Sequence, residues 1–145
     1  MNILNSKKNK ISVNNKIKLS NIINQSNVFF LHNINNKKQL LTKISSIVEG
    51  HTNFSKQKIL DLLLKKENDE NTSIGSGVAL PNIKLSCIEK SIGIFVKLNK
   101  PIHYNSVDNE PVDIILFLIS PKSDFPVYLN ELAYISRFLT KKKTL

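Results

Sequence analysis

The spacing of apolar residues predicts two consecutive helices in the first half of the chain. Asn36 is a good N-cap with Gln39 three residues later, and one apolar face follows at helical spacing: Leu40, Leu41, Ile44, Ile47 and Val48. Gly50 is expected to end this helix. A second helix is expected from Ser55, with Phe54 and Ile59 at the spacing of a hydrophobic staple.

The pattern then changes to the shorter period of strands. A short strand is predicted at "VFFL", and further strands are predicted at "GVAL", "SIGIFVKL" and "PVDIILFLIS". The stretch "PNIKLSCIEK" is expected to be a connection, with turns at 99–101 and 105–111. The run 114–119 is continuously apolar, as in a strand buried on both faces.

A last amphipathic helix is predicted near the end of the chain, with Pro126 near its first turn. Its apolar positions are Leu129, Leu132, Ile135 and Leu139, with Ser136 beside them. Helices on both sides of a mainly buried sheet predict an α/β domain.

Length and composition are those of a single domain of 145 residues. No apolar run approaches the roughly 20 residues that span a bilayer, and the N-terminus lacks the apolar core of a signal peptide. The single cysteine, Cys87, excludes an intramolecular disulfide framework. We therefore expect a cytoplasmic protein without a membrane span, with a disordered lysine- and asparagine-rich tail at 1–19 and one domain at 20–145.

The net charge of +10 suggests a nucleic-acid partner, but its distribution argues against one. Five lysines lie in residues 1–20 and three at 141–143, and the remainder has 13 basic and 11 acidic residues. Arg137 is the single arginine, whereas proteins that read bases usually favour its bidentate fork. No nucleic-acid partner is expected, and weak binding of the tail to RNA or acidic lipid stays open.

The three histidines do not have the spacing of a metal site, and one cysteine cannot form a zinc constellation. His32, His51 and His103 are therefore expected at the surface, and no metal or cofactor is expected. No nucleophile elbow, Walker loop or dinucleotide fingerprint occurs.

Two further short motifs have unremarkable interpretations. The "GSG" at 75–77 is too short for a specific phosphate loop and predicts a tight turn. Asp108, Glu110 and Asp113 could serve acid–base chemistry or hold a cation, but in a turn that enters a strand they are expected to be solvated. Pattern alone thus gives an α/β domain without an active site.

Five stretches occur in the order and spacing of one family: "NKKQLL", "ILDLLLKKE", "TSIGSGVALPN", "SVDNEPVDIILFLISP" and "YLNELAYISRFL". Over roughly residues 22–140 the chain resembles the IIA component of the bacterial phosphoenolpyruvate-dependent phosphotransferase system. The fructose/mannitol class is closest, and within it the nitrogen-regulatory type. The resemblance implies a mixed β-sheet flanked by α-helices, and a chain that lacks the family's last helix.

The resemblance also implies a site. In the family the Gly-rich strand ends in Pro-His, and this histidine accepts a phosphoryl group from the phosphocarrier HPr or its nitrogen-branch counterpart. That position is Asn82 here, and the position of the supporting histidine is Tyr128. The family's Arg-Glu pair corresponds to Lys66 and Glu67.

Further remnants of the phosphate pocket are expected in the turn of Gly75, Ser76 and Gly77, whose backbone N–H groups could hold an oxyanion. No catalytic residue of the family is intact.

The hypothesis is a regulator that cannot be phosphorylated and acts by contact with an HPr-like phosphocarrier or a regulatory target protein. Whether the chain is an enzyme stays open, because phosphoryl transfer through another acceptor, with His103 as candidate, is one alternative. The others are an anion-binding module that uses the lysine tails and a degenerate relative without function.

Overall fold

The computed structural model describes residues 27–122, which form one mixed sheet and two helices. The helices are α3 (Lys37–His51) and α4 (Lys56–Asp69). The strands are β1 (Val28–Leu31), β2 (Ser73–Gly75), β3 (Val78–Ala79), β4 (Asn82–Leu85), β5 (Ile92–Ile102) and β6 (Val112–Pro121). The expected mixed α/β architecture is confirmed.

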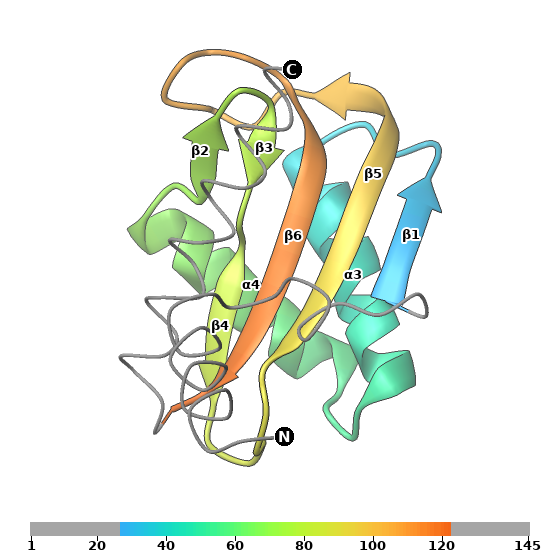
Figure 1. Ribbon diagram of the computed structural model, residues 1–145, viewed down its shortest axis with the longest axis vertical. Helices are drawn as coiled ribbons and strands as arrows, with labels where there is room; N and C mark the ends of the chain where they lie inside the picture. Colours follow the sequence, from blue (N-terminus) through green and yellow to red (C-terminus); the bar gives the residue numbers. More distant parts are fainter. Residues whose placement is uncertain (1–26, 123–145) are drawn as a thin grey trace, which may run out of the picture.

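The sheet is built around the antiparallel pair β5 and β6, and its order is β1-β5-β6-β3-β2. β1 runs parallel to β5 at one edge. β3 and β4 follow each other along the other side of β6, both parallel to it, and β2 pairs with β3 alone (Figure 1). α3 and α4 cover one face of this sheet (Figure 1).

The main core lies between the two helices and the sheet. The helices contribute buried apolar side chains at the predicted spacing: Leu40, Leu41, Ile44, Val48, Ile59 and Leu63. From β6, Ile115, Phe117 and Ile119 belong to this core, whereas Leu116 and Leu118 are fully buried outside it. Because successive side chains of a strand point to opposite faces, β6 is buried on both faces, as its apolar run predicts.

Both predicted helix starts are confirmed, because the side chains of Asn36 and Ser55 accept hydrogen bonds from the third residues of their helices. The predicted stop at Gly50 is wrong, since α3 continues to His51. The Thr52 hydroxyl donates to the Val48 carbonyl at 2.7 Å, and His51 Nδ1 lies 2.9 Å from the Ile47 carbonyl oxygen. These side chains satisfy carbonyls of the last turn, so the helix ends without a left-handed glycine.

Two strand predictions need correction. The stretch 81–90 was expected to be a connection but contains β4, and its pairing with β6, for example Ile83 with Ile119, outweighs its weak local pattern. β5 continues through the predicted turn at 99–101 to Ile102. Pro101 is tolerated there because the ladder with β6 is irregular between Lys97 and Ile102. The short strand β2 was not predicted.

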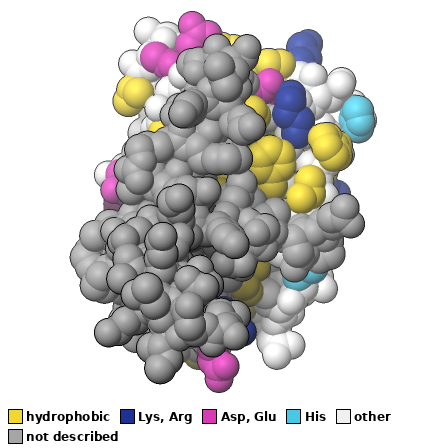
Figure 2. All heavy atoms as spheres, in the orientation of Figure 1, with side chains coloured by type: hydrophobic (Ala, Val, Ile, Leu, Met, Phe, Trp, Pro, Cys, Tyr) yellow, Lys and Arg dark blue, Asp and Glu magenta, His cyan; other side chains and the backbone are white. Residues whose placement is uncertain are grey.

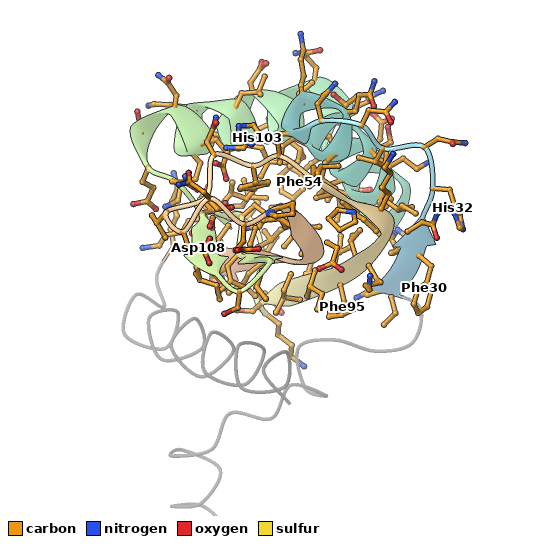
Figure 3. All side chains as sticks on the ribbon, turned by 90° about the horizontal axis from the view of Figure 1, so that it is seen from above. Phe30, His32, Phe54, Phe95, His103 and Asp108 are labelled. Atoms are coloured by element: carbon orange, nitrogen blue, oxygen red, sulfur yellow. The ribbon has the colours of Figure 1, made fainter. Side chains whose placement is uncertain are left out.

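The sheet face away from α3 and α4 carries aromatic side chains near the β1 edge. Phe30 is 70% exposed, and Figure 3 shows it with Phe95 on the side of the sheet opposite the helices. Hydrophobic side chains gather over β1 and β5 on this face (Figure 2).

Several predictions concern residues that the structure does not describe. The tail at 1–19 and the last predicted helix, 129–139, lie outside the described residues. Neither α3 nor α4, the helices of residues 27–122, has the length and apolar character needed to cross a membrane.

Candidate functional site

Asn82 is the first residue of β4 and is held firmly in place. The backbone just before it is fixed to the centre of the sheet, because the N–H of Leu118 donates to the Pro81 carbonyl at 3.0 Å. The Asn82 side chain is buried, and its Nδ2 donates to the Leu80 carbonyl at 2.8 Å. Its Oδ1 is buried without a hydrogen-bond partner in the part of the chain that the structure describes.

The Asn82 side chain cannot act as a nucleophile. The lone pair of an amide nitrogen is conjugated with its carbonyl, and here the same nitrogen also donates a hydrogen bond to backbone. The free Oδ1 can accept a hydrogen bond, as one edge of a neutral imidazole does. Asn82 can thus take part in recognition but cannot form a phosphoramidate.

A hollow of about 340 Å³ lies between α4 and β4, and we call it the Asn82 hollow. Its lining residues are Leu62, Lys65, Lys66, Asp69, Asn82, Ile83 and Lys84. Three ammonium groups against one carboxylate make it favourable for an anion. Lys66 pairs with Glu70 at 2.6 Å, but both side chains are substantially exposed, so this pair contributes little and leaves Lys66 available.

The turn of Gly75, Ser76 and Gly77 lies in a different hollow. Its three residues all have positive φ, at 88°, 58° and 79°, which confirms the predicted tight turn. The backbone N–H of Ser76 donates to Asp108 Oδ2 at 2.9 Å, and the N–H of Glu110 donates to Asp108 Oδ1 at 3.1 Å. These backbone donors hold the pKa of Asp108 below its usual range.

This second hollow, the turn hollow, has a volume of about 430 Å³ and an acidic lining. Its residues are Ser76, Gly77, Pro101, Asp108, Glu110, Pro111 and Asp113. Figure 3 shows Asp108 beside the β2–β3 turn. Asp108 and Glu110 are exposed, as expected, whereas Asp113 is partly buried and pairs with Lys97 at 2.9 Å. The turn already binds a carboxylate of its own chain, so it does not offer an empty oxyanion cradle.

A buried polar cluster connects the end of α4 to the segment that leads into β2. Glu67 accepts hydrogen bonds from the hydroxyl of Tyr104, at 2.8 Å, and from that of Thr72. Its other oxygen pairs with Lys37 Nζ at 3.0 Å, and this ammonium lies 4.1 Å from the centre of the Tyr104 ring. Burial, followed by the charge of Glu67, raises the pKa of Tyr104 well above its usual range. We call this group the Glu67 cluster.

The cluster fixes the start of the β2–β3 region relative to α4, which carries Lys65 and Lys66. Sequence reasoning noted Glu67 only through the family resemblance and missed Tyr104 and Thr72. Tyr104 lies in a polar stretch between a strand and a predicted turn, and no periodicity marks it as buried.

The expected surface position of the three histidines is confirmed, since His32, His51 and His103 are all exposed. His103 Nε2 lies 2.7 Å from Asn105 Oδ1, and neither the Asn82 hollow nor the turn hollow includes it. Within residues 27–122 no three potential ligand side chains are grouped closely enough to hold a metal ion. Tyr128 lies outside the described residues.

Comparisons with known proteins agree with this architecture. The family model described as "Phosphoenolpyruvate-dependent sugar phosphotransferase system, EIIA 2" matches residues 21–145. A nitrogen regulatory protein of Bradyrhizobium diazoefficiens is 35% identical over 106 residues, which are 73% of this chain and 69% of that protein.

Two solved structures share the fold. The nitrogen regulatory protein IIA-Ntr of Neisseria meningitidis has a TM-score of 0.76 at 22% identity, with 81% of each chain covered. The mannitol enzyme IIA of Escherichia coli, solved in complex with phosphorylated enzyme IIB, has a TM-score of 0.60 at 12% identity, with 77% of this chain and 78% of that chain covered.

Proposed function

Because the chain belongs to the EIIA 2 family of the phosphoenolpyruvate-dependent sugar phosphotransferase system and is of the nitrogen-regulatory type, we propose that it is a regulatory IIA protein locked in the unphosphorylated state. In this proposal Asn82 occupies the position of the family's phospho-accepting histidine. The protein acts by binding another protein and transfers no phosphoryl group.

The burial and the hydrogen bonding of Asn82 are the main support for this proposal. Asn82 is 6% exposed, its Nδ2 donates a hydrogen bond to the Leu80 carbonyl, and it lines a hollow whose charge suits an anion. The scaffold around the position is therefore well formed although the side chain cannot accept phosphorus. A well-formed site around a residue that cannot react favours a protein that binds a partner over a degenerate protein without function.

We assign the partner to the class of HPr-like phosphocarrier proteins. A phosphoryl group on such a carrier has a charge of about −2 at neutral pH and is attracted by Lys65, Lys66 and Lys84 around the hollow. The mannitol enzyme IIA that shares the fold of this chain was solved in complex with phosphorylated enzyme IIB. That complex supports contact with a phosphorylated partner. A regulatory target that binds unphosphorylated IIA proteins is the second partner of this proposal.

Restoration of the acceptor tests the proposal. The full chain and the double variant Asn82→His/Tyr128→His are incubated with phosphoenolpyruvate, Enzyme I and the HPr-like carrier, and intact masses are recorded. The double variant is expected to gain one phosphate that is labile in acid and stable in base. Asn82→Gln is the matched control, because it keeps an amide at this position and is expected to gain none.

The native chain is expected to stay unmodified while it remains folded and binds the carrier. One phosphate on the native chain would contradict the proposal, and His103 would be the first acceptor to test. A folded double variant without phosphate would refute the assignment of Asn82 to the acceptor position.

A further inference from the structure

A groove of about 580 Å³ follows the outer side of α3, and we call it the α3 groove. Lys38 and Lys43 of α3 line it, as does Lys56 at the start of α4. Asn36, Gln39 and Thr42 are also among its lining residues, and no carboxylate is. The groove shares no lining residue with the Asn82 hollow.

The three lysines of the groove take no part in the ion pairs of Lys37, Lys66 and Lys97 within residues 27–122. Glu49 Oε2 accepts a hydrogen bond from the backbone N–H of Lys56 at 2.8 Å, but no carboxylate of the described residues forms an ion pair with the ammonium groups of Lys38, Lys43 or Lys56. Three ammonium groups along one groove, with one carboxylate near its end, create a positive local potential.

The amide side chains increase this preference for an anion. Asn36 Oδ1 accepts from the backbone N–H of Gln39, and Gln39 Oε1 accepts from the backbone N–H of Asn35, both at 2.8 Å. The oxygens of both amides are thus engaged in the cap of α3, and the groups that remain to be satisfied are NH₂ donors. Ammonium and NH₂ groups together suit a ligand that only accepts hydrogen bonds, such as a carboxylate.

We propose that the α3 groove binds an extended acidic segment of a partner protein. Lys38 and Lys43 are five residues apart on α3, so they lie about 7.5 Å apart along the helix axis and about 140° apart around it, and Lys56 comes from the start of α4. Because the three cations are spread along the groove, several carboxylates of one extended chain fit them better than a single small anion does. The lining contains no aromatic residue to stack on bases and no arginine, which favours a polypeptide over a nucleic acid.

The proposal is tested with the full chain and a labelled ten-residue peptide of alternating Glu and Ser. Saturable binding is expected by fluorescence anisotropy, and the affinity is expected to fall as salt is raised. The double variant Lys38→Glu/Lys43→Glu is expected to bind at least about tenfold more weakly, because two attractions become repulsions. Both lysines are exposed, so circular dichroism and thermal melting are expected to confirm an intact fold.

Lys90→Glu/Lys100→Glu is the matched control, because it changes the net charge equally at two exposed lysines away from the groove. It is expected to change the affinity by less than about twofold. Equal losses in both double variants would overturn the proposal and leave only an effect of net charge. Absence of saturable binding, or tighter binding of a ten-nucleotide oligouridine than of the peptide, would also overturn it.

Discussion

The Asn82 hollow and the turn hollow lie along the same side of β6, and they differ in how their charge is balanced. The turn hollow has an anion-binding backbone, but Asp108 of the same chain already occupies it. The lining of the Asn82 hollow has three lysines against one carboxylate, Asp69. The family resemblance implied one phosphate pocket made from both regions. Within residues 27–122 the two regions line separate hollows, and of these two the Asn82 hollow has the lining that attracts an external anion.

The Glu67 cluster holds the two regions in their relative position, so its loss is expected to have the largest effect. Glu67→Ala removes the acceptor of Tyr104, Thr72 and Lys37 from a side chain that is 7% exposed. We expect the free energy of unfolding to fall by about 3 kcal/mol, because two buried hydroxyl donors and the partly buried ammonium group of Lys37 lose their partner. Urea denaturation measures this change.

Glu70→Ala is the control for that variant, because Glu70 lies one residue beyond α4 and its pair with Lys66 is exposed. A loss below about 0.5 kcal/mol is expected there. Similar losses in both variants would mean that the Glu67 cluster does not hold the two regions together.

Gly75→Ala is expected to damage the turn hollow and leave the Asn82 hollow intact. Gly75 has a φ of 88°, and a Cβ at this position would lie 3.3 Å from Asp108 Oδ2. We expect a loss of about 2 kcal/mol in the free energy of unfolding. Gly50→Ala gives a contrast of opposite sign, since Gly50 lies within α3 in open space. There we expect a gain of about 0.5 kcal/mol by thermal melting.

These two glycines also show what the sequence could and could not predict. The pattern predicted a tight turn at 75–77 and a helix stop at Gly50, and only the first is confirmed. A glycine in the sequence does not reveal its φ, and the side chains of His51 and Thr52 ended α3 without its help. The strong local signals, the caps at Asn36 and Ser55 and the apolar run of β6, were predictable.

Features that depend on residues distant in the sequence could not be predicted from the local pattern. β4 exists because β6 pairs with it, and no periodicity in "PNIKLSCIEK" indicates that partner. The same holds for Asp108, which reaches the β2–β3 turn from more than 30 residues away, and for Tyr104 in the Glu67 cluster. The family resemblance implied that Asn82 and Lys66 belong to the same pocket, and both line one hollow.

The charges of the Asn82 hollow are expected to decide the binding of a phosphorylated carrier. Lys65→Glu/Lys66→Glu is expected to weaken that binding about tenfold, because two nearby cations become anions. Asp108→Asn in the turn hollow is expected to leave the affinity unchanged. Isothermal titration calorimetry with the phosphorylated carrier measures both affinities. Equal losses of affinity in the two variants would contradict the claim that the carrier binds at the Asn82 hollow and not at the turn hollow.

The smallest effect is expected from Asp108→Asn on stability, and it depends on pH. The pKa of Asp108 is lowered from 3.8 in the folded state by the backbone N–H groups of Ser76 and Glu110. A lowered folded pKa contributes stability above the unfolded value, and this contribution is lost as pH falls through the folded value. The melting temperatures of the variant and the native chain should therefore differ most well above pH 3.8 and converge as the pH falls below the lowered folded value. A constant difference across this range would contradict the role of the charge.

The central claim, that Asn82 keeps a binding site without its chemistry, is tested most directly by one mixing experiment. The carrier is phosphorylated, separated from Enzyme I and mixed with the native chain, and native mass spectrometry records the complex and the position of the phosphate. We predict a complex in which the carrier keeps its phosphate and the chain gains none. Transfer of the phosphate to the chain would contradict the account.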